Sequence, residues 1–211
     1  MLQYNNSNIQ VNIITFIDGK MYKKLANHIK STCPDFPDDE INNLFKYFEV
    51  EELPKKAMFL NEGSKCLKAG YVISGCFRHF VRNSDGAEFI TRFAMEDYWI
   101  GDIQSVSYGT MSNTNIEALE DSVLLTIFAN DYNLLLKESI HFATFTEKKR
   151  ARAMLAAETR AAEFSENAEK RYKILLSKHP DISNRVPQYL LASYLGITPE
   201  SFSRMIKNIK Y

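Results

Sequence analysis

Residues 186–211 read VPQYLLASYLGITPESFSRMIKNIKY and contain two short helical patterns separated by Gly196. Glycine takes the positive φ that a helix C-terminus often needs, so we expect the first helix to end there. Thr198 suits the N-cap of the second helix, and Pro199 suits its first position, where no amide hydrogen is required. The stretch therefore predicts a helix-turn-helix.

The second of these helices would have two chemically different faces. Apolar side chains recur at three- and four-residue spacing and would face a core, namely Phe202, Met205, Ile206 and Ile209. The turn and the opposite face would carry the residues that we expect to contact DNA, namely Thr198, Glu200, Ser201, Ser203, Arg204 and Lys207. Arginine can donate two hydrogen bonds to guanine, glutamate can accept one from cytosine, and serine and lysine suit phosphate. Short helix pairs with a glycine turn also occur in all-helical enzymes and adaptors, so the motif alone leaves these readings open.

The distribution of charge favours nucleic acid. The whole chain is neutral, with 26 basic and 26 acidic residues. Residues 169–211 hold eight basic and three acidic residues, a net charge of +5, which leaves −5 on residues 1–168. A basic C-terminal module on an acidic body is the distribution that phosphate binding requires.

Composition limits the class of protein. With 211 residues and 45% hydrophobic content the chain can bury a sizeable core. Its three cysteines are an odd number without paired spacing, and no stretch resembles a signal peptide or a membrane span, so we expect a cytoplasmic protein that does not enter a membrane. The sequence contains no glycine-rich phosphate loop, paired metal-ligand motif or nucleophile elbow. We therefore expect neither an enzyme nor a metal site.

The middle of the chain has the sequence pattern of a β-rich domain. Six of the eight glycines lie between residues 48 and 127 and separate short runs rich in β-branched and aromatic residues. Such spacing predicts an antiparallel sandwich or barrel. The expected strands are residues 57–60, 71–73, 76–81, 88–93, 115–119 and 123–127. Asp85 and Gly86 suit the positive φ values of a tight hairpin turn.

A long helical segment follows. Residues 131–179 contain neither glycine nor proline, and residues 145–164 are rich in Ala, Glu, Lys and Arg. A stripe of alanines with Met154 and Leu155 allows close approach of another helix. The stripe fits either packing on the chain's own barrel or a dimer seam, and a DNA-reading module favours the dimer, because two copies can read two half-sites.

A β-barrel, a long helix and a helix-turn-helix in this order resemble the Crp/Fnr family of bacterial transcriptional regulators. The resemblance covers residues 21–209 and rests on YVISGCFR at 71–78, DGAE at 85–88, IGD at 100–102 and the block from EKRY at 169–172 to SR at 203–204, which is most like the versions in Bacteroidetes. It implies an α+β protein with a cyclic-nucleotide-binding-like jelly roll (double-stranded β-helix) at residues 21–140, a dimerisation helix at 141–166 and a DNA-binding domain at 167–211, behind an extension of uncertain status at 1–20. The implied partners are double-stranded DNA, a second copy of the chain, RNA polymerase and an unidentified small effector.

The resemblance also locates a ligand cassette, which is degenerate here. Family members that bind a cyclic nucleotide use Gly-Glu-Leu followed by Arg-Ser-Ala, and the matching positions are Gly101, Asp102, Ser112, Asn113 and Thr114. The phosphate-binding arginine is missing, and residues 100–125 contain no Lys or Arg. The helix positions that would meet the base are Ala156 and Ala157, whose side chains cannot form hydrogen bonds. We therefore expect no useful affinity for cyclic AMP.

The residues of this sequence match the requirements of other effectors of the family to different degrees. An iron–sulfur cluster needs about four cysteine ligands, and this chain has three scattered ones. A haem would need an axial ligand such as His28, His79 or His141, but lone histidines are more often ordinary residues. The remaining option is an apolar or uncharged ligand lined by aromatic residues, although these fit a plain core better: Phe77, Phe93, Tyr98 and Trp99.

The DNA-reading end departs from the family pattern. Pro199 stands where a base-reading arginine is common, and the stretch between Lys178 and Pro187 leaves little room for a wing hairpin. We expect a winged-helix-like domain with a reduced wing and fewer phosphate contacts. The alternative is a ligand-binding signalling or adaptor module that does not bind specific DNA.

Overall fold

The computed structural model describes residues 6–209, and side chains from residue 19 onward. Two helices and a 3-10 turn precede the sheets: α1 (Asn6–Thr32), α2 (Asp38–Leu44) and η1 (Phe45–Tyr47). The helix α1 continues through Met21 without a break. The strands are β1 (Glu49–Leu53), β2 (Met58–Leu60), β3 (Lys68–Ser74), β4 (Phe77–Arg82), β5 (Glu88–Ala94), β6 (Trp99–Ile100), β7 (Asn115–Ala118) and β8 (Ser122–Phe128), with the short helix α3 (Ile103–Tyr108) between β6 and β7.

The strands form two four-stranded sheets in the orders β1-β8-β3-β6 and β2-β7-β4-β5, and every pairing is antiparallel. The expected jelly roll is thus confirmed, and each expected strand is present with its ends moved by a few residues. The tight link between β3 and β4 requires glycine at Gly75, whose φ is +119° and where a Cβ would lie 2.1 Å from the Ser122 Oγ.

The hairpin between β4 and β5 corrects one detail of the sequence analysis. Gly86 has a φ of +80°, but Asp85 does not take a positive φ. The turn is held instead by the side chain of Asn83, whose Oδ1 accepts hydrogen bonds from the Asp85 amide at 3.1 Å and the Ala87 amide at 2.9 Å. An asparagine side chain that bonds nearby amides stabilises such a turn without a second left-handed residue.

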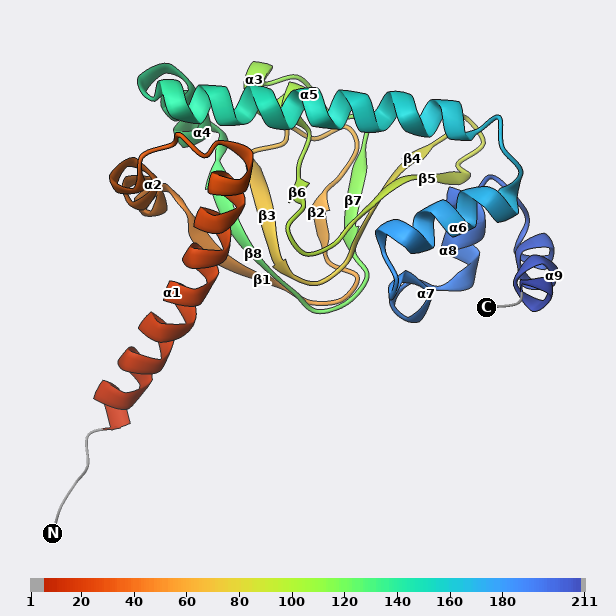
Figure 1. Cartoon of the computed structure of the whole chain (residues 1–211), viewed down its shortest axis with the longest axis horizontal. Coiled ribbons are helices and arrows are strands. Elements are labelled where there is room, and N and C mark those ends of the chain that lie inside the picture. The colour runs from red at the N-terminus through yellow and green to blue at the C-terminus, as the bar shows by residue number, and fades with distance from the viewer. Residues whose placement is uncertain (1–5, 210–211) are drawn as a thin grey trace, which may run out of the picture.

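Helices follow the sheets as far as Asn208, and residues 131–179, which lack glycine and proline, are largely helical as predicted. They are α4 (Ala129–Glu138), α5 (Ile140–Glu163), α6 (Ala168–Lys178), α7 (Ile182–Arg185), α8 (Gln188–Tyr194) and α9 (Pro199–Asn208). Ser139 separates α4 from α5 and caps α5 by accepting a hydrogen bond from the Phe142 amide at 3.1 Å. The helix α5 runs along the β-roll, and α6 to α9 form a compact group beneath its C-terminal end (Figure 1).

Two buried clusters hold the molecule together. The first lies inside the roll and extends to α1, α2, α4 and the start of α5, with Tyr71, Phe77 and Phe145 completely buried. The second joins the β4–β5 hairpin to the C-terminal helices, where Phe80 and Phe93 share a core with Leu191. The C-terminal helices are therefore packed on the β-roll rather than tethered to it.

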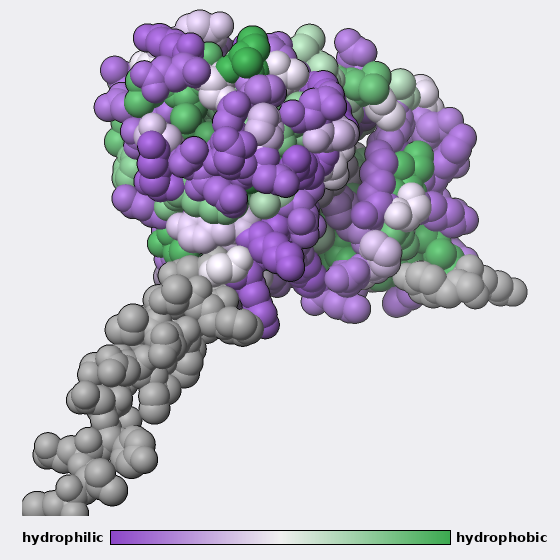
Figure 2. Space-filling view, turned by 60° about the vertical axis from the view of Figure 1, so that its left-hand side comes forward, coloured by the Kyte–Doolittle hydropathy of each residue, from purple (hydrophilic) through white to green (hydrophobic). Residues whose placement is uncertain are grey.

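The wing is reduced, as the sequence indicated. Within residues 168–209 there is no strand, and the stretch between Lys178 and Pro187 forms the four-residue helix α7. The face shown in Figure 2 is largely hydrophilic, with apolar residues in small separate areas. Across residues 6–209, none of the helices combines the length and the apolar character needed to cross a bilayer.

Candidate functional site

The helix pair α8–α9 has the local geometry that its sequence predicts. Gly196 has a φ of +67°, and the amide of Ile197 donates a hydrogen bond to the Ala192 carbonyl at 3.1 Å. Thr198 then caps α9, because its Oγ1 accepts a hydrogen bond from the Ser201 amide at 3.2 Å. These contacts fix the angle between the two helices.

The two faces of α9 separate as expected. Phe202 is 1% exposed and packs edge-on against Tyr172, with ring centroids 5.2 Å apart. The residues expected to contact DNA lie together on the turn and the outer face of α9: Thr198, Glu200, Arg204 and Lys207 are exposed, and Ser201 and Ser203 are half-buried. Arg204 and Lys207 form no salt bridge with any described residue. Both cations are therefore available to an anionic partner.

The cassette positions lie close together, and their polar side chains form hydrogen bonds within the cassette loop itself. Asp102 caps α3, because its Oδ1 accepts a hydrogen bond from the Ser105 amide at 3.1 Å. Its Oδ2 accepts another from the Ser112 hydroxyl at 2.7 Å, and that hydroxyl accepts one from the Thr114 amide at 3.1 Å. Asn113 points to the exposed side of the loop. The carboxylate is therefore used inside the loop, and a ribose hydroxyl would have to displace an existing hydrogen bond.

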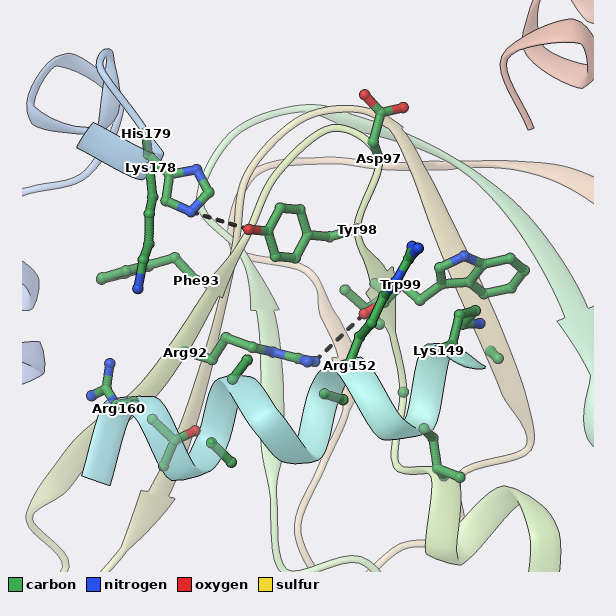
Figure 3. Close-up of a pocket in the computed structure, with 18 of the residues that line it drawn as sticks. Arg92, Phe93, Asp97, Tyr98, Trp99, Lys149, Arg152, Arg160, Lys178 and His179 are labelled. Atoms are coloured by element: carbon green, nitrogen blue, oxygen red, sulfur yellow. Dashed lines mark hydrogen bonds between the residues drawn. The ribbon is translucent and has the colours of Figure 1, made fainter. Parts of the chain in front are cut away.

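A cavity of about 670 Å³ lies between the β-roll and α5 and reaches the C-terminal helices. Of the five cassette positions only Gly101 lines it. Five basic residues line it as well, namely Arg92, Lys149, Arg152, Arg160 and Lys178, against two acidic ones, Asp97 and Glu163 (Figure 3). A volume of this size falls in the range of small-molecule sites.

The two acidic residues of the cavity are already paired. The Glu163 carboxylate lies 3.0 Å from the Lys178 Nζ. The Asp97 carboxylate accepts a hydrogen bond from the Tyr71 hydroxyl at 2.6 Å and lies 3.4 Å from the ammonium group of Lys24. Four cations of the cavity wall consequently have no carboxylate within salt-bridge distance among residues 19–209: Arg92, Lys149, Arg152 and Arg160.

These cations contact neutral groups instead. The Arg92 Nη2 lies 3.1 Å from the His79 Nε2 and 3.5 Å from the Trp99 carbonyl oxygen. Burial, and then the nearby Arg92, hold the pKa of His79 well below its usual range, so the ring is neutral and can accept from the guanidinium. The Lys149 Nζ lies 3.3 Å from the centroid of the Trp99 ring, a cation–π contact. Burial lowers the pKa of both Arg92 and Lys149, because water no longer stabilises their charged forms.

Arg160 and Arg152 link the cavity wall to other elements. Arg160 donates to the Ile90 carbonyl on β5 at 3.4 Å and to the Tyr194 carbonyl at the end of α8 at 3.2 Å. Arg152 donates to the Thr32 hydroxyl on α1 at 3.1 Å. Side chains of α5 thus contact the β-roll, the N-terminal helix α1 and the end of α8.

Sequence analysis missed this charged cavity. Residues 100–125 do lack a cation, but the cations come from β5 and α5, which lie outside the cassette on either side of it in sequence. A signal was present: Lys149, Arg152 and Arg160 share the alanine-lined face of α5, and alternation along β5 places Arg92 on the same face as buried Ala94. Three of the aromatic residues considered for the lining do line it, namely Phe93, Tyr98 and Trp99, whereas Phe77 belongs to the core. The cavity wall is thus partly cationic, whereas the sequence analysis considered only aromatic residues for the lining.

A polar cluster joins the roll to the C-terminal helices. Arg185 of α7 donates to both carboxylate oxygens of Glu96, at 2.8 and 2.9 Å, and also bonds Glu120. Burial alone would raise the pKa of Glu96, but hydrogen bonds from Arg185 and from the Gly75 amide outweigh it and lower that pKa to about 2. We call these three side chains the Arg185 cluster.

Comparison with known proteins is consistent with this architecture. Residues 50–139 match the family profile of the cyclic nucleotide-binding domain. No curated protein sequence shows significant similarity to the chain. Among residues 6–209, no group of three or more His, Cys, Asp or Glu side chains is arranged to hold a metal ion.

Several solved structures share the fold over most of the chain. A protein from Eubacterium rectale, assigned to the Crp/Fnr family of transcriptional regulators, is 19% identical with a TM-score of 0.65, over 82% of this chain and 83% of that one. FixK2 of Bradyrhizobium japonicum is 16% identical with a TM-score of 0.65, over 76% and 83% of the two chains. The c-di-GMP-responsive global regulator CLP of Xanthomonas campestris is 15% identical with a TM-score of 0.63, over 81% and 90%. Residues 50–139 are therefore similar to a cyclic nucleotide-binding domain, and the chain as a whole shares the fold of these solved structures.

Proposed function

We propose that this protein is a DNA-binding transcriptional regulator of the Crp/Fnr type, which acts as a homodimer and responds to a small molecule in the cavity beneath α5. The observation that carries the proposal is the outer face of α9. There Arg204 and Lys207 are exposed and form no salt bridge within residues 19–209, on a helix whose angle is fixed by Gly196 and Thr198.

The chemistry of that face suits a major groove. Arg204 can donate two hydrogen bonds to a guanine edge, and Glu200 can accept one from a cytosine amino group. Lys207 and the serine hydroxyls of Ser201 and Ser203 suit phosphate oxygens. Because no wing strand is present in residues 168–209, fewer phosphate contacts are expected than in a complete winged helix.

A second copy of the chain is the proposed partner of α5. Residues 151–159 are all exposed, although they form the middle of a 24-residue helix. One face of this segment lines the cavity, and the outward face presents Met154 and Leu155, which are 65% and 63% exposed. An exposed apolar stripe flanked by alanines fits the seam of a helix pair. Two copies would also place two α9 helices to read two half-sites.

The cavity is positioned to relay occupancy to the DNA-reading helices. Its walls come from β5 and β6, from α5, and from α6 and α8, so one ligand would touch the sensor, the dimer helix and the DNA-binding module. Arg160 already joins β5 to the end of α8. A regulator working in this way would act in the cytoplasm, with RNA polymerase as a further partner.

The test is selection of sequences from a random pool of DNA duplexes by the full-length protein at physiological salt. We expect enrichment of a two-fold-symmetric site, lost in Arg204→Ala. The matched control is Lys137→Ala, which removes an exposed cation from α4. A signalling or adaptor module predicts no enrichment by any of these proteins, and that result would refute the proposal.

A further inference from the structure

We propose that the cavity is a receptor for a small organic anion, a carboxylate or phosphate head group on an apolar or aromatic body, whose head is held by Arg92, Lys149 and Arg152 rather than by the cassette at Asp102. The inference rests on the proposed function only for its consequence, the control of DNA binding. Anion binding itself is measured without DNA.

Cations that lack a carboxylate partner in the cavity wall are energetically unfavourable. A charged group taken out of water without a partner of opposite charge is strongly unfavourable. Among residues 19–209, Arg92 hydrogen-bonds only a neutral imidazole and a carbonyl oxygen, and Lys149 contacts only the faces of aromatic rings. Neither contact neutralises a full charge. A bound anion would supply the missing charge at both residues.

The second argument is the arrangement of donors. Arg92 extends into the cavity from β5 and Arg152 from α5 on the facing side, and Lys149 lies beside Trp99 (Figure 3). Arginine pairs with carboxylate and phosphate through two parallel hydrogen bonds, and lysine adds a point charge. An oxyanion placed among the three would receive donors from both walls.

The third argument concerns the rest of the ligand. Next to the cations the wall is formed by the alanine face of α5, Ala153, Ala156 and Ala157, and by apolar side chains such as Val106 and Leu175. These groups cannot form hydrogen bonds through their side chains. The part of the ligand that lies against this wall is therefore apolar or aromatic, and the volume of about 670 Å³ suits a small molecule.

The chain contains a built-in reporter for this binding. It has one tryptophan, Trp99, and that residue lines the cavity in contact with Lys149. The full-length protein is titrated separately with octanoate, octyl phosphate and neutral octanol, and binding is followed by the change in tryptophan fluorescence. We expect saturable binding of at least one anion, at least tenfold tighter than octanol. The better of the two anions identifies the head group, carboxylate or phosphate.

Single substitutions test whether Arg92 and Lys149 bind the anion. Arg92→Gln and Lys149→Gln should each weaken binding of the preferred anion at least tenfold. Lys148→Gln is the matched control, because it removes an exposed cation from the neighbouring position of α5 that does not line the cavity. Arg92→Gln also removes a half-buried charge without a carboxylate within salt-bridge distance among residues 19–209, so its melting temperature without ligand should equal or exceed that of the parent, whereas the anion-induced rise in melting temperature should disappear.

Three results would overturn the assignment: octanol bound as tightly as both anions, anion affinity unchanged in Arg92→Gln and Lys149→Gln, or binding of cyclic AMP that survives Arg92→Gln. The outcome is separable from the proposed function. Loss of DNA selection with anion binding intact refutes only the function, and DNA selection without anion binding refutes only the receptor.

Discussion

Replacing Arg185 by glutamine should loosen the C-terminal helices from the β-roll in a way that depends on pH. The side chain is 19% exposed and holds Glu96 and Glu120, which are 34% and 33% exposed. The pKa of Glu96 falls from 4.5 to about 2, and a shift of one pKa unit corresponds to about 1.36 kcal/mol. Because a third of that side chain is exposed, solvent screening reduces the full value, and we expect a loss of about 2 kcal/mol at pH 7.

The pH profile identifies the cause. A carboxylate whose pKa is lowered on folding stabilises the folded state above its unfolded pKa of about 4.5, and this stabilisation is lost as the pH falls toward 2. The difference in unfolding free energy between the parent and Arg185→Gln, measured by urea denaturation, should therefore shrink to less than half between pH 7 and pH 3. The control Lys173→Gln breaks an exposed pair with Glu169 and should cost under about 0.5 kcal/mol. A difference that is the same at both pH values would refute the role given to the Arg185 cluster.

Three further outcomes follow from the structure. Leu155→Glu places a charge on the proposed seam of α5 and should convert a dimer into a monomer in light scattering after gel filtration, whereas an unchanged mass would place the seam elsewhere. Burial raises the pKa of the Cys76 thiol to about 12, so alkylation of the native protein at pH 8 followed by mass spectrometry should leave it unmodified, and rapid labelling would contradict this. Lys207→Ala should reduce the slope of log affinity against log salt by about one while keeping the preferred DNA sequence, and an altered sequence preference would assign it a base contact instead.

Much of the fold could be predicted because its signals are local. The turn at Gly196 and the cap at Thr198 are set by neighbouring residues, and both are present as predicted. The strands bounded by glycines were also recognisable. Two strands were not recognisable from the sequence. The charged residues of β1, EVEEL, are not typical of a strand, and β6 has only two residues. Both form because β8 and β3 supply their hydrogen-bonding partners.

The cavity could not be predicted because its basic side chains come from elements that are separated in the sequence. The cassette is one contiguous stretch, and its lack of cations was plain from the sequence. Arg92 and Lys149 line one cavity only because β5 folds beneath α5, and nothing near either residue in sequence indicates the other. The docking of α8 on β5 is non-local in the same way, since the Ile90 amide donates to the Ser193 hydroxyl across 103 positions of sequence.

The most direct test of the account is genome-wide DNA affinity purification with the full-length protein and with Arg204→Ala, both at physiological salt. The account predicts that the parent recovers fragments sharing a two-fold-symmetric sequence with half-sites about one helical turn apart, and that Arg204→Ala does not recover them. Equal recovery of the same fragments by both proteins, or no fragment enriched by the parent over a control without protein, would contradict it.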